Sequence, residues 1–305
     1  MATATGTATN YLDLLSKLRT FLTTDATLVG LGQNWAELHT VSTPYTDSNG
    51  DTVEYETYLQ APGLSGTEAI FLNIQAYKNV VQDRYNFRMV GAIGYNSSST
   101  FVNQPGQSPY VYSCLWNQST PYWFIANGQR VIVIAKISTV YESFHLGKFL
   151  PYGSPGQYPY PVAVGGTSRI FSKRFSDATD DHRAFFSPCS LQVYQVDGTW
   201  QEFINQTLTG GSIAPRHVWP FSYEGSGTFL TWLAADQDGG YPLLPCILNM
   251  SLPSPNLLGE LDGVYFVPGY SQSSESVITI SSVNYEVFQN VFRTGAADYM
   301  AVKMA

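Results

Sequence analysis

Four carboxylates of this chain are of the type that could do acid–base chemistry. Glu142, Glu260 and Asp262 are candidates for the carboxylate pair with which glycosidases cleave sugars, and Asp181 is a fourth candidate. The chain is also rich in Tyr and Trp, whose rings suit sugar-binding clefts. The sequence, however, places no two of these carboxylates across a cleft at a defined distance. An enzyme, such as a glycan hydrolase, is therefore the third of three functional hypotheses.

Two histidines have neighbours that bear on chemistry. His182 follows Asp180 and Asp181 in the run DATDDHRAFF, and a histidine beside carboxylates can act as a base or bind a metal. Because this run consists largely of charged and polar residues, we expect an exposed, charged loop instead. His145 lies in a segment rich in Tyr and Phe, where we expect a partly buried imidazole with its hydrogen bonds satisfied.

The sequence contains none of the familiar motifs for metals, nucleotides or nucleophiles. Its cysteines, Cys114, Cys189 and Cys246, are widely spaced, so we expect buried thiols rather than disulfides or a zinc site. The run DSNGD at residues 47–51 begins like a calcium loop, but Tyr58 stands where the bidentate glutamate belongs, and a hairpin turn explains the run. The sequence therefore predicts no catalytic residue, no cofactor and no metal site.

The composition describes a folded chain with a weakly charged, aromatic-rich surface. Charged residues make up 12 % of the 305 residues, which is about half the usual share, and aromatic residues make up 14 %. The formal net charge is −8, and no basic run is present that could neutralise phosphates. We therefore expect no sequence-specific binding of nucleic acid.

The start of the sequence and its apolar runs bear on location. The opening run MATATGTATN lacks the charged and apolar regions of a signal peptide, and no apolar run approaches the length of a membrane span. We expect a chain that is made in the cytoplasm, that has no membrane span, and that reaches any outside location within a larger assembly.

Periodicity predicts helices near the start of the chain. In the run NYLDLLSKLRTFL, Tyr11, Leu15 and Leu22 fall on one helical face, and Asn10 or Thr9 is a suitable N-cap. The run DATLVGLGQNWAEL predicts a second, shorter helix, which its glycines weaken. These helices would form a segment that precedes the rest of the fold.

The remainder of the chain reads as short strands separated by turns. Asn-Gly pairs at residues 49–50 and 127–128 and an Asp-Gly pair at residues 197–198 are hairpin signals. The sequence therefore predicts a mainly β fold, with sandwich- or barrel-like antiparallel sheets and one or two short N-terminal helices. We expect residues 1–40 to be an N-terminal helical segment and residues 41–305 to be one β-rich body with long loops.

The stretch of residues 121–161 combines the most apolar strand with the most aromatic loop. The strand VIVIAKIS is apolar on both faces apart from Lys136, so it must be covered on both sides, by its own fold or by a neighbour. The loop after it is dense in Tyr, Phe and Pro, which restrict the backbone and offer large contact area. We expect this loop to be packed or to be made for contact.

Several blocks of the sequence resemble uncharacterised virion structural proteins of tailed bacteriophages. The blocks are residues 121–166, the opening GTATNYLDLLSKLRTFLTTD, the runs YPLLPCILNM and NLLGELDGVYFVPGY, and the ending FQNVFRTGAADYMAVKMA. They occur in the same order along nearly the whole chain. The resemblance carries no catalytic residues onto this sequence.

This resemblance implies a non-enzymatic structural subunit of a phage particle. The subunit would be associated with the tail or the neck, as in a collar, baseplate or tail-tip ring, and would contact identical subunits and other virion proteins. The alternative is a binding module on the virion surface that recognises a host glycan or an outer-membrane receptor. We expect the subunit contacts at aromatic and apolar residues of the first helix and the aromatic loop, namely Tyr11, Leu15, Tyr141, Phe144, Tyr152, Tyr158 and Tyr160.

Overall fold

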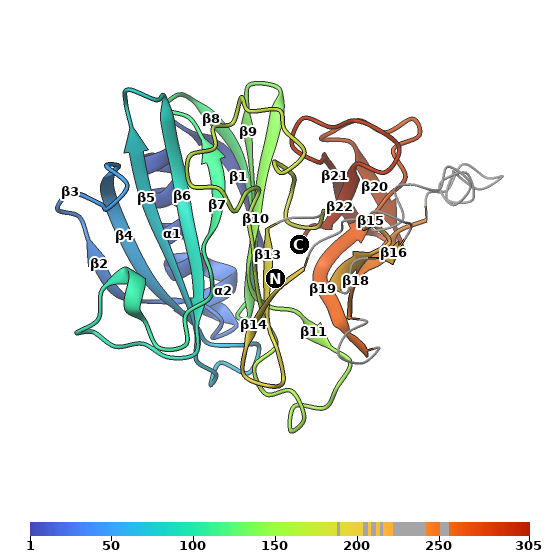
Figure 1. The fold of residues 1–305 in the computed structure, drawn as a ribbon. Coiled ribbons are helices and arrows are strands. Elements are labelled where there is room, and N and C mark those ends of the chain that lie inside the picture. Colours follow the sequence, from blue (N-terminus) through green and yellow to red (C-terminus); the bar gives the residue numbers. More distant parts are fainter. Residues whose placement is uncertain (188–189, 204–206, 209–211, 214–215, 222–241, 251–255) are drawn as a thin grey trace.

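The fold is mainly β and antiparallel, as the sequence predicts. The structure, a computed structural model, describes residues 1–187, 190–203, 207–208, 212–213, 216–221, 242–250 and 256–305. In these residues three large sheets lie side by side as layers, coloured blue to teal, green to yellow and orange to red in Figure 1. Cys189 lies outside the described residues.

The central sheet has seven strands. Its two edge strands come from the N-terminus, at residues 2–8, and from residues 200–203. Asn127 and Gly128 form the tight turn between its second and third strands, as the Asn-Gly signal predicts. The amide of Gly63 donates to the carbonyl of Gly128 at 2.6 Å, and this close approach leaves no room for a side chain at Gly128. The strands in spatial order are β1 (Ala2–Ala8), β8 (Thr120–Ala126), β9 (Arg130–Ile137), β10 (Val140–Lys148), β12 (Val162–Gly165), β13 (Leu191–Tyr194) and β14 (Trp200–Phe203).

The N-terminal sheet covers one face of the central sheet. The Asn-Gly pair at residues 49–50 lies in the turn between the strands at residues 45–46 and 52–61. In this turn the carboxylate of Asp47 forms an ion pair with Arg88, and that of Asp51 forms one with Arg84. A 3₁₀ turn, η1 (Phe101–Asn103), lies between its last two strands. The strands are β2 (Ala36–Val41), β3 (Tyr45–Thr46), β4 (Thr52–Ala61), β5 (Ile70–Asn79), β6 (Arg84–Ala92) and β7 (Val111–Leu115).

The C-terminal sheet covers the opposite face of the central sheet. A short strand of the aromatic loop, β11 (Leu150–Pro151), pairs with its longest strand. A separate hairpin consists of β15 (Thr207–Leu208) and β16 (Ser212–Ile213). The other strands in spatial order are β17 (Arg216–Trp219), β18 (Leu244–Met250), β19 (Asn256–Phe266), β22 (Tyr299–Lys303), β21 (Val283–Gln289) and β20 (Val277–Ile280).

Two hydrophobic cores separate the three layers. The first core lies between the central and N-terminal sheets and includes Val131 and Val133 of β9. The second core lies between the central and C-terminal sheets and includes Ile132 and Ile134 of the same strand. Successive side chains of a strand point to opposite faces. Apart from Arg130 and Lys136, β9 is therefore apolar on both faces because the chain itself covers both of them. The strand needs no neighbouring molecule for this cover.

Two helices lie near the start of the chain, as predicted, but they follow a strand, β1, that the sequence did not predict. α1 (Tyr11–Thr24) begins after Asn10, whose side chain accepts a hydrogen bond from the amide of Asp13 at 2.9 Å. Its apolar face enters the first core, and α2 (Ala26–Gly30) follows directly after Asp25. The predicted boundary at residue 40 falls inside β2, and β1 belongs to the central sheet. Residues 1–40 are thus woven into the β-rich body rather than forming a separate helical segment.

The first part of the predicted aromatic loop, with Tyr141 and Phe144, forms strand β10. The remainder, residues 149–161, is the aromatic loop of the structure, and it is packed against the body. Phe149 and Tyr158 lie in the second core with their rings edge to face. The hydroxyl of Tyr158 donates to the carbonyl of Tyr194, and that of Tyr160 donates to the carbonyl of Ala92 at 2.6 Å. The loop is therefore held by both ring packing and hydrogen bonds to the backbone of other strands.

Candidate functional site

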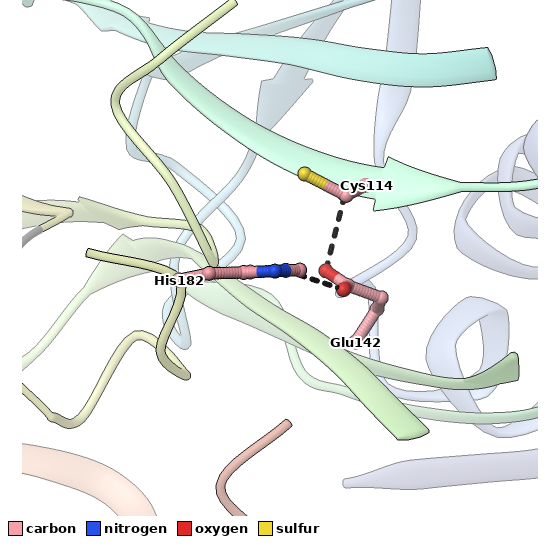
Figure 2. Close-up of side chains that lie close together, drawn as sticks. All are labelled: Cys114, Glu142 and His182. Carbon is pink, nitrogen blue, oxygen red and sulfur yellow. Dashed lines mark hydrogen bonds and ion pairs between the residues drawn. The ribbon is translucent and has the colours of Figure 1, made fainter. Parts of the chain in front are cut away.

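Three side chains with chemical potential meet between the central and N-terminal sheets. Cys114 lies on β7, Glu142 on β10 and His182 in the long connection that follows β12 (Figure 2). Glu142 pairs across the sheet with Ala135, which belongs to the first core, so its carboxylate points toward the N-terminal sheet. The sulfur, a carboxylate oxygen and an imidazole nitrogen all lie within 4.8 Å of one another. We call these residues the Cys–Glu–His cluster.

The carboxylate of Glu142 is the hub of this cluster. Its Oε1 accepts a hydrogen bond from Nε2 of His182 at 2.7 Å. Its Oε2 accepts one from the amide of Cys114 at 3.0 Å and another from the hydroxyl of Thr167. The side chains of Glu142 and His182 are fully buried. A carboxylate can be kept in such a place because charged and polar donors surround it.

The second ring nitrogen of His182 is also engaged. Nδ1 lies 3.0 Å from the carbonyl oxygen of Asp177, to which it donates. The backbone carbonyl of His182 itself accepts a hydrogen bond of 2.6 Å from Arg293. The ring is therefore fixed in orientation, with a proton on Nδ1 and with Nε2 facing the carboxylate.

Electrostatics makes the imidazole cationic and the thiol neutral. Burial disfavours the charged imidazole, but the Glu142 carboxylate and the thiol of Cys114 outweigh it and raise the pKa of His182 to about 11. Burial and the same carboxylate raise the pKa of Cys114 to about 11. At neutral pH the cluster thus holds an imidazolium, a carboxylate and a thiol, with no net charge.

This arrangement does not activate the thiol as a nucleophile. A reactive cysteine has a lowered pKa and some exposure, whereas Cys114 is buried and its pKa is raised. A catalytic histidine also needs one ring nitrogen free to take a proton, and both nitrogens of His182 are engaged with Glu142 and Asp177. What the cluster can do in this state is tie β7, β10 and the connection after β12 together.

The structure corrects our expectation for His182. The residue is fully buried and ion-paired, whereas the sequence suggested an exposed, charged loop. The charged neighbours point elsewhere: Asp180 is 99 % exposed, and Asp181 pairs with Lys173 at 2.8 Å. Glu142, the ion-pair partner of His182, is distant in the sequence. The only signal in the sequence was the acidic run around His182, and that run does not contain the partner.

The four predicted carboxylates each have their own partners. Asp262 accepts a hydrogen bond from Arg130 Nε at 3.0 Å, and the guanidinium of Arg130 is fully buried. Glu260 accepts one from the hydroxyl of Tyr152 at 3.2 Å. Glu142 is bound into the Cys–Glu–His cluster and Asp181 is paired with a lysine. Among the described residues, the four carboxylates are each bound to a different cation or hydrogen-bond donor. The structure therefore does not present them as a pair of carboxylates facing each other across a cleft.

His145 also differs from expectation. It lies on β10 opposite Ile132 and is fully buried beside the second core, near Phe185. Neither ring nitrogen makes a hydrogen bond of ordinary geometry with the described residues. Burial, together with the nearby positive charge of Arg130, lowers the pKa of His145 to about 4. The imidazole is therefore neutral, and within the described residues it lacks the well-formed hydrogen bonds that the sequence led us to expect.

Most of the predicted contact residues are core residues. The side chains of Tyr11, Leu15, Tyr141, Phe144 and Tyr158 are each at most 5 % exposed, and Tyr160 is partly buried against the first core. The five fully buried side chains are enclosed by their own chain and leave almost no surface for another subunit, so we withdraw these five positions. Tyr160 keeps part of its surface, and Tyr152, which is 51 % exposed, is the predicted contact residue that a neighbour could reach most fully.

Comparisons with known proteins add no family. The chain matches no model of a known protein family and no curated protein. Within the described residues, no helix combines the length and the apolar character needed to cross a membrane.

Proposed function

We propose that this chain is a non-enzymatic structural subunit of a tailed-phage particle, located at the tail or the neck. A collar, baseplate or tail-tip ring of identical copies would suit it. The proposal rests on the sequence blocks described above and on one structural observation: exposed apolar side chains gather where the aromatic loop meets its neighbours. The Cys–Glu–His cluster is buried and links separate elements of the fold, which supports a structural role for these side chains.

These exposed apolar side chains come from four segments, namely the end of β6, the aromatic loop, the turn after β13 and β19. The amide of Tyr152 donates to the carbonyl of Leu258 at 3.0 Å, which joins the aromatic loop to β19. Leu258 and Val196 line one hollow of about 170 Å³, and Val196 and Ile93 line a second of about 340 Å³. We call this surface the apolar patch; its exposed members are Ile93, Leu150, Tyr152, Val196 and Leu257.

The apolar patch has the character of a subunit contact. Val196 is 60 % and Tyr152 51 % exposed in the single chain, and Tyr is a residue that contributes strongly to interfaces. The hollow beside Ile93 is lined by apolar, aromatic and amide side chains without a charge. A stiff aromatic loop also loses little conformational entropy on binding. A second copy of the chain is the occupant that we propose.

The oligomeric state tests the role of the apolar patch. We expect the wild-type chain to form a discrete oligomer in analytical ultracentrifugation, and Tyr152→Ser with Val196→Ser to weaken assembly by at least about tenfold. The matched control is Val81→Ser, because Val81 is 97 % exposed in the turn between β5 and β6, away from the patch. Equal assembly of both variants would exclude the patch as the contact.

The location in a particle needs a separate measurement. Mass spectrometry of purified particles from a phage that encodes this chain should detect it in several copies per particle. Particles that are complete and infectious but lack the protein would overturn the proposed role, whatever the oligomeric state of the isolated chain.

A third hollow, in the N-terminal sheet, favours the alternative, which is a module that binds a host glycan. It has a volume of about 270 Å³ and is lined by the rings of Tyr45, Tyr58 and Phe101 and by the carboxylate of Glu56. Aromatic faces beside a buried carboxylate suit the apolar and hydroxyl groups of a sugar. If this function holds, Tyr45→Ala should abolish binding to isolated host envelope, while Tyr152→Ser should leave it unchanged.

A further inference from the structure

The Cys–Glu–His cluster has the donor set of a metal site. A thiol, an imidazole and a carboxylate are the three side-chain groups that bind zinc in proteins. Here they come from β7, β10 and the connection after β12, and their donor atoms converge within 4.8 Å. Figure 2 shows the carboxylate of Glu142 and the ring of His182 pointing toward each other, with the side chain of Cys114 on the neighbouring strand beside them. Such convergence from three separate elements is what a ligand set requires.

We propose that Cys114, Glu142 and His182 bind a zinc ion. Sulfur of the cysteine, Oε1 of the glutamate and Nε2 of the histidine would be the protein ligands. Three protein ligands leave a fourth position for a neutral solvent molecule. The proposal does not depend on whether the chain is a virion subunit.

The surroundings already orient the donors for this role. A zinc-bound histidine commonly donates its other ring N–H to a backbone carbonyl, and Nδ1 of His182 donates to Asp177 in this way. The amide of Cys114 and the hydroxyl of Thr167 both bind Oε2 of Glu142, which leaves Oε1 as the oxygen that faces the histidine. These bonds fix the orientation of two of the three ligands before any ion arrives.

Charge balance allows the ion to enter without leaving a net charge buried. In the metal-free state the imidazolium and the carboxylate cancel, and the thiol is neutral. When Zn²⁺ binds, the cysteine loses its S–H proton and the histidine loses its Nε2–H proton, so two protons are released. The bound state then holds one divalent cation, one thiolate and one carboxylate, and again sums to zero. Burying an unbalanced charge would oppose binding, and this site avoids that cost.

Small movements of His182 and Cys114 complete the site. Nε2 and Oε1 are 2.7 Å apart, whereas two such ligand atoms on a tetrahedral zinc are about 3.3 Å apart. His182 belongs to a connection without helix or strand between residues 167 and 187, so its ring can shift by roughly half an ångström without breaking a sheet. The sulfur of Cys114 lies within 4.8 Å of the other two donor atoms, and rotation of its side chain on β7 would bring it to the bonding distance of about 2.3 Å from the ion.

Cobalt provides the probe, because a thiolate bound to Co²⁺ gives an intense sulfur-to-metal absorption band. The full chain is produced in medium supplemented with Co²⁺ or Zn²⁺, and bound metal is counted by elemental analysis. We expect about one equivalent of metal per chain in the wild type and a sulfur-to-cobalt band. His182→Gln removes a ligand and should lower the affinity by at least about 100-fold, because loss of an outer-shell partner alone costs about 10–100-fold. Wild-type protein without the band, or with metal that washes off freely, would overturn the proposal.

The cysteines of the chain provide matched variants. Cys246 is also a buried free thiol, but it lies in the second core, away from the cluster. We expect Cys114→Ser to lose the band and Cys246→Ser to keep it. Should Cys114→Ser fail to fold, the double variant Cys189→Ser with Cys246→Ser leaves Cys114 as the sole thiol. Retention of the band there supports the site, and its loss assigns the metal elsewhere and overturns the proposal.

Discussion

The two faces of β10 each adjoin a buried histidine, and the pKa values of these two histidines are shifted in opposite directions. On the face toward the N-terminal sheet, Glu142 holds the imidazolium of His182, whose pKa is raised to about 11. On the face toward the C-terminal sheet, burial and, after it, the nearby positive charge of Arg130 lower the pKa of His145 to about 4. Both histidines are fully buried. The difference shows that the charge of the nearest partner, and not burial alone, decides the protonation state.

The largest expected effect comes from removing the counter-charge on the first face. In metal-free protein, Glu142→Gln leaves the buried imidazolium of His182 without a partner, which should lower the free energy of unfolding by about 3–5 kcal/mol at pH 7. Urea denaturation measures this loss. The control is Glu260→Gln, because Glu260 is partly exposed and accepts a single hydrogen bond from Tyr152; it should lose less than about 1 kcal/mol. Equal losses would contradict the comparison.

Acid should destabilise the second face. His145 has a pKa of about 4 in the folded chain and an ordinary value of 6.5 when unfolded, so below pH 6.5 the unfolded state takes up a proton that the folded state refuses. The free energy of unfolding should therefore fall as the pH drops from 6.5 to 4, by about 3 kcal/mol from this residue. His145→Leu should flatten the dependence in urea denaturation at a series of pH values. An unchanged slope would show that His145 already has a partner for its proton.

Alkali should act on the first face in the opposite direction. The pKa of His182 is raised to about 11 from an ordinary value of 6.5, so the ion pair stabilises the fold fully below pH 6.5. That stabilisation is lost progressively as the pH rises toward 11. In metal-free protein, His182→Gln should reduce the slope of stability against pH in this window and leave the acid limb unchanged. A larger change on the acid limb would contradict the assignment.

The smallest effect is expected where an ion pair faces solvent. Arg169 and Glu202 are 3.0 Å apart, but their side chains are 49 % and 24 % exposed. Arg169→Ala should change the free energy of unfolding by less than about 1 kcal/mol, and salt should reduce the effect further. A loss comparable with that of Glu142→Gln would mean that the enclosure of the first face contributes nothing.

Local signals in the sequence predicted much of the fold. The Asn-Gly and Asp-Gly pairs act through their immediate backbone conformation, so the hairpins at residues 127–128 and 197–198 were readable. Asn10 capped the first helix as expected. The strand VIVIAKIS indicated cover on both faces, and the choice between self-cover and a neighbour needed the topology of the three sheets.

The Cys–Glu–His cluster could not be predicted because its members are linked only through the fold. No short spacing joins Cys114, Glu142 and His182, and the acidic run around His182 resembles a solvated loop. Composition alone also did not separate contact candidates from core residues, for a related reason. Tyr rings serve equally in cores and at interfaces, so composition does not distinguish Tyr158, which is buried, from Tyr152, which is exposed.

The most direct test of the two-faced β10 is the protonation state of its two buried histidines. Two-bond ¹H–¹⁵N spectra of the histidine side chains, recorded on metal-free protein from about pH 5 to pH 9, separate the charged and neutral rings. The account predicts that His182 stays doubly protonated and His145 stays neutral across the whole range. Titration of both rings near pH 6.5 would contradict it, because neither histidine would then feel the partner that the structure places beside it.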